Sequence, residues 1–513
     1  MAKKTRPAAP KLVLGWKVTK GMDPEYWLEP GAKPGGHLKN HLETVAAQDI
    51  TQHTMIVAQS GSGKSFFLGR LIEEIVLRTR CQVLVLDPNS DFRKIYAPTE
   101  PDYWKKKAKY DTTKRRGFLP DEASRAQFWQ RWKPKSKKVY TAKGGSSAHV
   151  ERLVVNWHAL SIDWLFRESD PARRTELWHF HRFMHLVTLL LEPAQINAGR
   201  GQRKGKTIKP RRKEKALLDL IKKLSLGLAK GKGDPRDDMA RMVEIITNHP
   251  AFRRKKNAPT RPVESAEGHD LESRRDNTID RAASHMSYVS PDTVRYYFSV
   301  LHERRQSDLF TFHANRSSAP DHEQIRVVDL PSIDDDEHRA IIVSYFLERE
   351  WNEARERWRV ALSRGRDLDE RVPVFIVVDE AHNFVFAEAR NPTQVRLQEQ
   401  FRRIAAEGRK FGLFLILVTQ RPDKIDRWVV SEMENRALMK IGSDFVLRKT
   451  GKLLGLNSHT QETSARCLEF DSGRVMLIGP WAGKEDRFLY GALRRTEEGG
   501  RNLREESWMV VKR

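Results

Sequence analysis

The chain has 513 residues, of which 39% are hydrophobic, and it carries a formal net charge of +25. This length and apolar content exclude a disordered chain and suffice for a sizeable core in about two to four structural units. The positive charge favours a polyanionic partner, nucleic acid or an anionic membrane, without choosing between them.

Signals for membrane insertion, secretion and disulfide bonding are missing from the sequence. No apolar run approaches the ~20 residues that span a bilayer, and the basic N-terminus lacks the apolar stretch of a secretory signal. The two cysteines, Cys81 and Cys467, form no CxxC pair, which argues against a disulfide framework or a thiolate metal site. We therefore expect a cytoplasmic protein without a membrane partner.

Five short apolar runs each end in a polar cluster. They lie at 52–58, 83–92, 325–330, 374–384 and 413–422. Near-continuous runs of this kind are typical of a parallel sheet that is covered on both faces, and ligands of such sheets gather at the carboxyl ends of the strands. Helical patterns at 64–78, 335–362 and 395–410 supply the crossovers that parallel strands require. The predicted fold class is α/β.

A long polar and basic stretch interrupts the predicted sheet. We expect an N-terminal segment at 1–50, a first core part at 51–98, a mostly helical insertion at 99–324, a second core part at 325–485 and a C-terminal tail at 486–513. Within the insertion, residues 199–215 concentrate nine Lys and Arg without apolar periodicity. This composition favours a solvated or disordered loop.

The segment AQSGSGKS, Ala58 to Ser65, follows a predicted strand and opens a predicted helix, which is the context of a Walker A motif. Its glycines let the backbone wrap around phosphates, and the helix N-terminus offers free N–H groups and a positive dipole. Lys64 is expected to reach the β- and γ-phosphates, and the Ser65 hydroxyl to ligate Mg²⁺. A plain Gly/Ser-rich turn is the alternative, and Ala58 replaces the usual first glycine. The predicted ATP-binding residues are Ser60, Gly61, Ser62, Gly63, Lys64, Ser65 and Phe66.

The apolar run Val374 to Val378 carries two acids to the same edge of the sheet. Asp379 is expected to hold Mg²⁺, and Glu380 to polarise the attacking water as general base. A strand that merely ends in a solvated acidic turn is the alternative. Gln420 ends another run, where it can contact the γ-phosphate or the water. Asp87 has only a supporting role, since an acid there can instead cap the following turn.

Five motifs follow one another along the chain. They are the Walker A motif, LDPNSDF at 86–92, VVDLPSIDDDEHRAIIVSYF at 327–346, VDEAHNF at 378–384 and EGRKFGLFLILVTQRP at 407–422. In this order they resemble the HerA branch of the HerA/FtsK superfamily, over less than half of the chain. The resemblance implies a RecA-like core, assembled as a hexameric ring that pumps DNA through a central channel and often serves a partner nuclease or effector.

The resemblance suggests an ATP-driven DNA translocase or helicase motor. HerA proteins begin with a small β-barrel, and the residues before the P-loop strand are too few for it, so a diverged relative from an antiphage defence module fits better. Two alternatives are a ring scaffold that activates an effector without translocation, and a conjugation or secretion ATPase. DEAH helicases share the letters of Asp379 to His382, but they carry two RecA-like domains where this sequence has one P-loop core.

A single core leaves the arginine that stabilises γ-phosphate charge to a neighbouring subunit. Arg409, at the end of the helix before Gly412, is the first choice for this finger in trans, with Arg402 and Arg403 as fallbacks. The alternative for Arg409 is a basic last turn that complements the helix dipole.

Three basic segments are candidates for DNA contact. They lie at 104–116, 199–215 and 253–256. Such segments can track phosphates and bind DNA without sequence preference, although charge runs are more often solvated loops.

Overall fold

The computed structural model describes residues 10–17, 42–99, 122–132, 137–156, 171–191, 323–364, 371–492 and 494–499, with short stretches between 160 and 170 and between 289 and 311. The chain forms two compact units. The first comprises Met1–Arg152 and Pro320–Arg513, and the second comprises Leu153–Ala319. Among the described residues, no helix combines the length and apolarity needed to cross a membrane.

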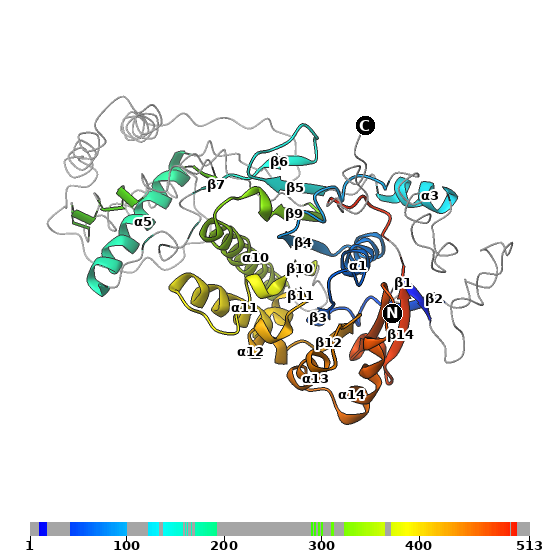
Figure 1. The fold of residues 1–513 in the computed structure, drawn as a ribbon. Helices are drawn as coiled ribbons and strands as arrows, with labels where there is room; N and C mark the ends of the chain where they lie inside the picture. Colours follow the sequence, from blue (N-terminus) through cyan, green and yellow to red (C-terminus); the bar gives the residue numbers. More distant parts are fainter. Residues whose placement is uncertain are drawn as a thin grey trace, which may run out of the picture. The chain divides into compact units, whose positions relative to one another are not determined.

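A twelve-stranded sheet organises the first unit (Figure 1). Its order is β2 (Leu42–Ala46), β1 (Lys11–Lys17), β14 (Arg487–Gly491), β13 (Arg474–Ile478), β12 (Asn435–Leu438), β3 (Thr54–Val57), β11 (Leu413–Thr419), β10 (Val374–Val378), β4 (Gln82–Asp87), β9 (Ile325–Asp329), β5 (Lys137–Thr141) and β6 (Val150–Arg152). The eight strands from β12 to β6 are parallel, and the remaining pairings are antiparallel. The predicted α/β class with a mainly parallel sheet is confirmed.

Helices cover both faces of the parallel strands. Helix α1 (Lys64–Arg78) lies on one face, and α10 (Asp336–Arg364) and α11 (Pro392–Phe411) lie on the other (Figure 1). Side chains alternate along each strand, so every second residue joins the core with α1. On the α1 side these residues are Val83, Val85, Phe375, Val377, Ile416 and Val418. The residues between them are buried as well, which explains why the strands have near-continuous apolar sequences.

The helix ends follow from local chemistry. Asn391 caps α11, because its side chain accepts a hydrogen bond from the Gln394 N–H at 2.8 Å, and Pro392 occupies the first turn. The same helix stops at Gly412, whose φ of 84° is left-handed. This stop places the start of β11 directly after the helix.

Further strands extend the sheet at both of its edges. β1 pairs with β14, and β2 pairs with β1, at the edge beyond β13. At the other edge, β5 pairs with β9, and β6 pairs with β5. β5 and β6 therefore belong to the sheet, although they lie in the range where an insertion was expected. Helix α3 (Glu122–Trp132) also lies in that range, and its fully buried Trp132 joins the core of the first unit.

The second unit contains α5 (Pro171–Leu191) and a parallel pair of two-residue strands, β7 (Val155–Asn156) and β8 (Phe310–Thr311). Its described core combines aliphatic side chains with four aromatic ones, Phe166, Phe180, Phe183 and Tyr297. The His181 ring lies on the buried side of α5, 2.8 Å from both the Tyr297 hydroxyl and the Leu160 carbonyl oxygen. His181 therefore has a packing role inside this unit.

We predict an acid-sensitive step in stability from His53, which precedes β3. Its side chain is buried, and Nδ1 accepts a hydrogen bond from the Leu415 N–H at 2.9 Å. Burial lowers the pKa of His53 to about 4. The unfolded chain binds this proton below about pH 6.5 and the native chain does not, so stability falls as pH drops from 6.5 toward 4, by about 3 kcal/mol.

Urea unfolding of wild type and His53→Asn across this pH window tests the prediction. Asn offers an oxygen in place of Nδ1 and does not titrate, so its profile should lack this part of the decline. His459→Asn, at an exposed position, is the control and should retain the wild-type slope. Parallel profiles for wild type and His53→Asn would contradict the assignment.

Candidate nucleotide site

Four neighbouring parallel strands end at one edge of the sheet. β3 lies beside β11, β11 beside β10, and β10 beside β4. The loop after β3 and the acids after β10 are therefore separated by a single strand, and the residues after β11 lie between them. Ligands of parallel sheets bind at such carboxyl ends.

The loop after β3 has the backbone of a phosphate-binding turn. Gly61 and Gly63 have φ values of 74° and 89°, in the left-handed region that glycine adopts without strain. Ala58 is buried and does not have a positive φ, so the Cβ at this position is compatible with the turn. Ser60 and Gly61 are exposed and Phe66 is half-buried. The Ser62 hydroxyl is buried without a hydrogen-bond partner among the described residues.

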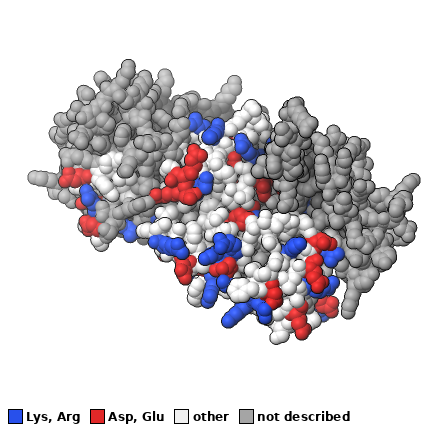
Figure 2. Space-filling view, in the orientation of Figure 1, with Lys and Arg blue, Asp and Glu red and all other residues white. Residues whose placement is uncertain are grey.

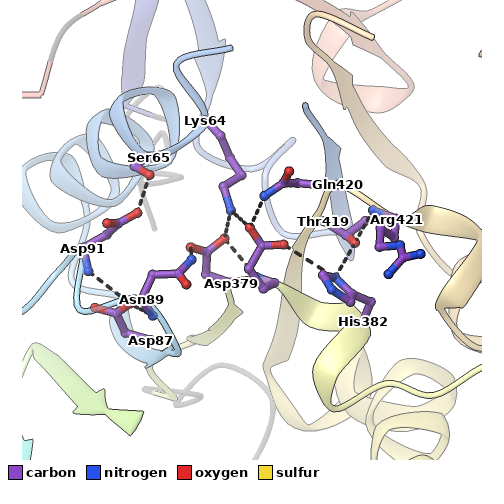
Figure 3. A network of polar contacts seen from close by, with 11 residues as sticks. Lys64, Ser65, Asp87, Asn89, Asp91, Asp379, His382, Thr419, Gln420 and Arg421 are labelled. Atoms are coloured by element: carbon purple, nitrogen blue, oxygen red, sulfur yellow. Dashed lines mark hydrogen bonds and ion pairs between the residues drawn. The ribbon is translucent and has the colours of Figure 1, made fainter. Parts of the chain in front are cut away.

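Lys64 meets both acids after β10 (Figure 3). Its Nζ donates to Asp379 Oδ1 at 2.8 Å and to Glu380 Oε1 at 2.5 Å. All three side chains are at least nine-tenths buried. A buried ammonium requires this compensation, since desolvation of an unpaired charge costs several kcal/mol.

Glu380 is held by contacts from three directions. Its backbone is left-handed, with φ 42° and ψ 50°, which is unusual for a residue with a side chain. Gln420 Nε2 donates to Oε1 at 2.6 Å. The other oxygen, Oε2, lies 3.5 Å from His382 Nδ1, which is itself 3.2 Å from Thr419 Oγ1. The loop after β10 and the end of β11 are thus linked at Glu380, and Figure 3 shows His382, Thr419 and Gln420 on its two sides.

The pKa values in this cluster follow from burial and from the Lys64 charge. Burial raises the pKa of Asp379 although Lys64 opposes it. Burial acts in the same direction on Glu380, but the hydrogen bond and charge of Lys64 outweigh it and lower its pKa. Burial alone would lower the pKa of Lys64, and the two carboxylates raise it instead. Glu380 is therefore ionised at neutral pH, as a proton acceptor has to be.

The turn after β4 supplies a second group of polar contacts. The Ser65 hydroxyl donates to Asp91 Oδ2, and Asn89 Nδ2 donates to Asp379 Oδ2 at 3.4 Å. Asp87 accepts backbone N–H groups from residues 89, 91 and 92 of the same turn, at 2.7 to 3.2 Å. Asp87 thus caps the turn, and this turn brings Asn89 and Asp91 to the site.

The structure brings Lys64, Asp379, Glu380 and Gln420 together, as the sequence motifs predict. Sequence reasoning missed the roles of Asn89, Asp91, His382 and Thr419. All four lie within the motifs at 86–92, 378–384 and 407–422, at or just after the ends of β4, β10 and β11, and these positions were the available signal. The partners that they contact lie on other strands, and no spacing in the sequence identifies them.

Arg409 lies away from this cluster. It forms an ion pair with Glu434, and about half of its side chain is exposed. It precedes β11, whereas Gln420 follows the seven residues of that strand, a separation of roughly 20 Å along the sheet. Within one chain Arg409 is therefore at the opposite edge from Lys64.

The two fallback arginines have partners within the chain. Arg402 donates to both carboxylate oxygens of Asp426, at 2.7 and 3.2 Å. Arg403 pairs with Glu348 at 2.9 Å and stacks over Trp351. The three basic segments proposed for DNA contact, 104–116, 199–215 and 253–256, lie outside the described residues.

Part of the chain is similar to known proteins. The model of the HerA helicase central domain matches residues 42–169. The DNA double-strand break repair helicase HerA of Sulfolobus acidocaldarius is 31% identical over 160 residues, which are 30% of this chain and 29% of that protein. The HerA of Sulfurisphaera tokodaii is 34% identical over the same shares. The chain contains a HerA-like P-loop ATPase core.

The similarity to HerA covers part of this chain and part of each relative. The matched segments span less than a third of the length of these curated relatives. The structure of VirB4 of Thermoanaerobacter pseudethanolicus covers 96% of this chain and 98% of its own, at 14% identity and a TM-score of 0.40. The RecA-like fold of the HerA-like core follows from the strand order, in which β11 lies between β3 and β10, and from the site at their carboxyl ends.

We predict that Lys64→Met lowers the free energy of unfolding at pH 7.5 by about 3 kcal/mol without nucleotide, because it leaves two buried carboxylates unpaired. The deficit should shrink as pH falls toward 5, where protonation neutralises these acids. The sign follows from the variant, in which burial still raises the pKa of Asp379 and Glu380 and Lys64 no longer opposes it. The folded variant then binds protons at a higher pH than its unfolded chain does, so its stability rises as pH falls toward 5.

Urea unfolding of both chains at the two pH values measures the deficit. Adding Asp379→Asn and Glu380→Gln to Lys64→Met removes the unpaired charges and should restore most of the loss. A deficit that is the same at both pH values would show that lost packing, not charge, accounts for it.

Proposed function

We propose that this chain is an ATP-driven motor that acts on DNA. The observation that carries the proposal is the junction of Lys64 with Asp379 and Glu380, completed by Gln420. A lysine after a glycine-rich turn, two acids after the next strand but one and a neutral amide after the strand between are the groups that phosphoryl transfer to water requires.

The residues present fit a nucleotide with Mg²⁺. Nothing lies within 4 Å of the position that a Cβ on Gly61 would take, so the turn is open on that side. The buried Ser62 hydroxyl lacks a partner among the described residues. Lys64 holds two carboxylates in a position where phosphate oxygens can replace them. Ser65 and Asp379 offer the oxygen ligands that Mg²⁺ prefers.

Mg²⁺–ATP supplies the terminal phosphoryl group that is transferred to water. The backbone N–H groups of Lys64 and Ser65 at the start of α1 would bind phosphates, and Lys64 would turn from the carboxylates toward them. Glu380, released from Lys64, accepts the proton of the attacking water. Gln420 holds Glu380 Oε1 at 2.6 Å and senses whether that carboxylate has moved.

Charge and relatives support DNA as the substrate. The net charge of +25 favours a polyanion, and the curated relatives are named DNA double-strand break repair helicases. On the face shown in Figure 2, Lys and Arg are interspersed with Asp and Glu over the described residues. We further propose a homo-oligomeric ring, with six subunits as the expected number. Service to a partner nuclease or effector, and a role in antiphage defence, stay predictions.

We predict that Glu380→Gln binds ATP but loses at least about a hundredfold in turnover, because the proton acceptor is gone. ATP hydrolysis should be stimulated by DNA in the wild type. Phosphate release with and without duplex and single-stranded DNA measures both effects, and Lys64→Ala is the control that fails to bind. Wild-type turnover in Glu380→Gln would refute the site. Hydrolysis that is indifferent to DNA would favour the alternative of a scaffold that activates an effector.

We predict that Arg409 acts in trans. Arg409→Ala and Lys64→Ala should each be inactive, and a mixture should regain hydrolysis, because an intact site then faces an intact arginine of a neighbouring subunit. Glu434→Gln, which frees Arg409 from its ion pair, should leave the activity in place. A mixture that is no more active than its components would exclude Arg409 as the finger.

A further inference from the structure

The segment Arg494–Gly499, here called the strap, lies along the turn that follows β4. The Arg495 carbonyl oxygen accepts from the Thr99 N–H at 3.0 Å, the Glu497 N–H donates to the Ala97 carbonyl at 2.9 Å, and the Gly499 N–H donates to the Asp91 carbonyl at 3.1 Å. Residues about four hundred positions apart are thus bound together beside the candidate nucleotide site.

Arg494 fastens the strap to Asp91. It is fully buried, and its guanidinium donates to the carbonyl oxygens of Asp91, Thr496 and Glu497, at 3.1, 3.1 and 2.7 Å. It also stacks over the Phe92 ring. A buried arginine with these donors bonded fixes the position of the carbonyl groups that it contacts.

The strap is fastened to helix α1 as well. Glu73 Oε1 accepts from the Arg495 N–H, the Thr496 N–H and the Thr496 hydroxyl, at 2.7 to 2.9 Å. Gly69 of α1 leaves room for Arg494, since a Cβ there would lie 2.8 Å from Arg494 Cδ. Helix α1 begins at Lys64 and Ser65, so the strap holds Asp91 and the start of this helix in one frame.

Within this frame Asp91 accepts the hydroxyl hydrogen of Ser65. A serine that ligates a cation uses an oxygen lone pair and keeps its O–H, which then needs an acceptor. With the hydrogen directed to Asp91, the lone pairs of Ser65 point elsewhere. Asn89, from the same turn, directs Asp379 in a similar way through Oδ2.

We propose that Asp91, held by the strap through Arg494, is a positioning residue for the cation that accompanies the nucleotide. It orients Ser65 by accepting its hydroxyl hydrogen, and Arg494 keeps Asp91 in place. The inference rests on the proposed nucleotide-binding function and adds a part of the chain, Arg494–Gly499, that the five motifs do not include.

The test measures the dissociation constant of ATP in Mg²⁺ and in excess EDTA. The readout is the Kd in EDTA divided by the Kd in Mg²⁺, which gives the factor by which Mg²⁺ tightens binding. In wild type ATP should bind more tightly with Mg²⁺. Asp91→Ala should reduce this ratio about tenfold, the size expected when a partner of a metal ligand is removed, and leave the EDTA value within about twofold. Asp91→Asn keeps an acceptor oxygen and should retain most of the ratio. Glu432→Ala, at an exposed acid, is the matched control.

Two variants test the strap itself. Arg494→Lys keeps the charge but cannot serve three carbonyl groups in one plane, and Gly69→Ala displaces Arg494 without touching the nucleotide site. Both should lower the same ratio, while thermal unfolding reports whether the fold is intact. If either variant unfolds, the comparison of Asp91→Ala with Asp91→Asn tests whether Asp91 positions the cation.

The outcomes separate the two proposals. Wild type that binds ATP in neither condition refutes the proposed function. Wild type with a clear Mg²⁺ effect that Asp91→Ala leaves unchanged overturns the positioning role. Equal weakening of Asp91→Ala with and without Mg²⁺ would also overturn it, because it would show a general structural role for this side chain.

Discussion

The burial of one ammonium between two carboxylates is the interaction on which this site depends. Lys64 and Asp379 are 315 positions apart in the chain, yet their polar atoms lie 2.8 Å apart with almost no solvent access. Only the strand order makes this possible, because β3 and β10 flank the single strand β11. Charges buried in this way are costly unless paired, so the fold keeps its stability only while both partners are present.

The loops that carry the acids and the amide are also joined beyond the site. Phe386 forms a bridge with Ile425, and the Asp426 N–H donates to the Val385 carbonyl at 3.2 Å. His382 and Thr419 link the same two loops near Glu380. A change in the position of Glu380 therefore acts on a connected segment and not on a single side chain. The left-handed backbone of Glu380 is maintained by this surrounding structure, as strained residues at functional sites require.

Sequence could predict the parallel strands because they are apolar on both faces, and each ends at a recognisable polar cluster. It could also place Lys64, Asp379, Glu380 and Gln420 at one edge. It could not assign β1, β2, β5 and β6 to the sheet, because these edge strands have weaker patterns and their pairing depends on distant segments. The sequence placed Ser65 in the Walker A motif but could not predict its contact with Asp91, because the local sequence of Asp91 signals only a turn and that of the strap only a polar tail.

Under the proposed function, the charge balance of the site calls for a further cation beside the nucleotide. Among the described side chains, Lys64 is the cation bonded to the carboxylates of Asp379 and Glu380, while the charges of Arg494 and Arg421 act on Asp91 and His382 beside them. A triphosphate adds further negative charge, and Mg²⁺ neutralises only part of it. Arg409 could supply the missing cation, but it stands at the far edge of its own sheet, paired with Glu434. The same position that removes Arg409 from its own site leaves it half-exposed, where it can face the site of another copy of the chain.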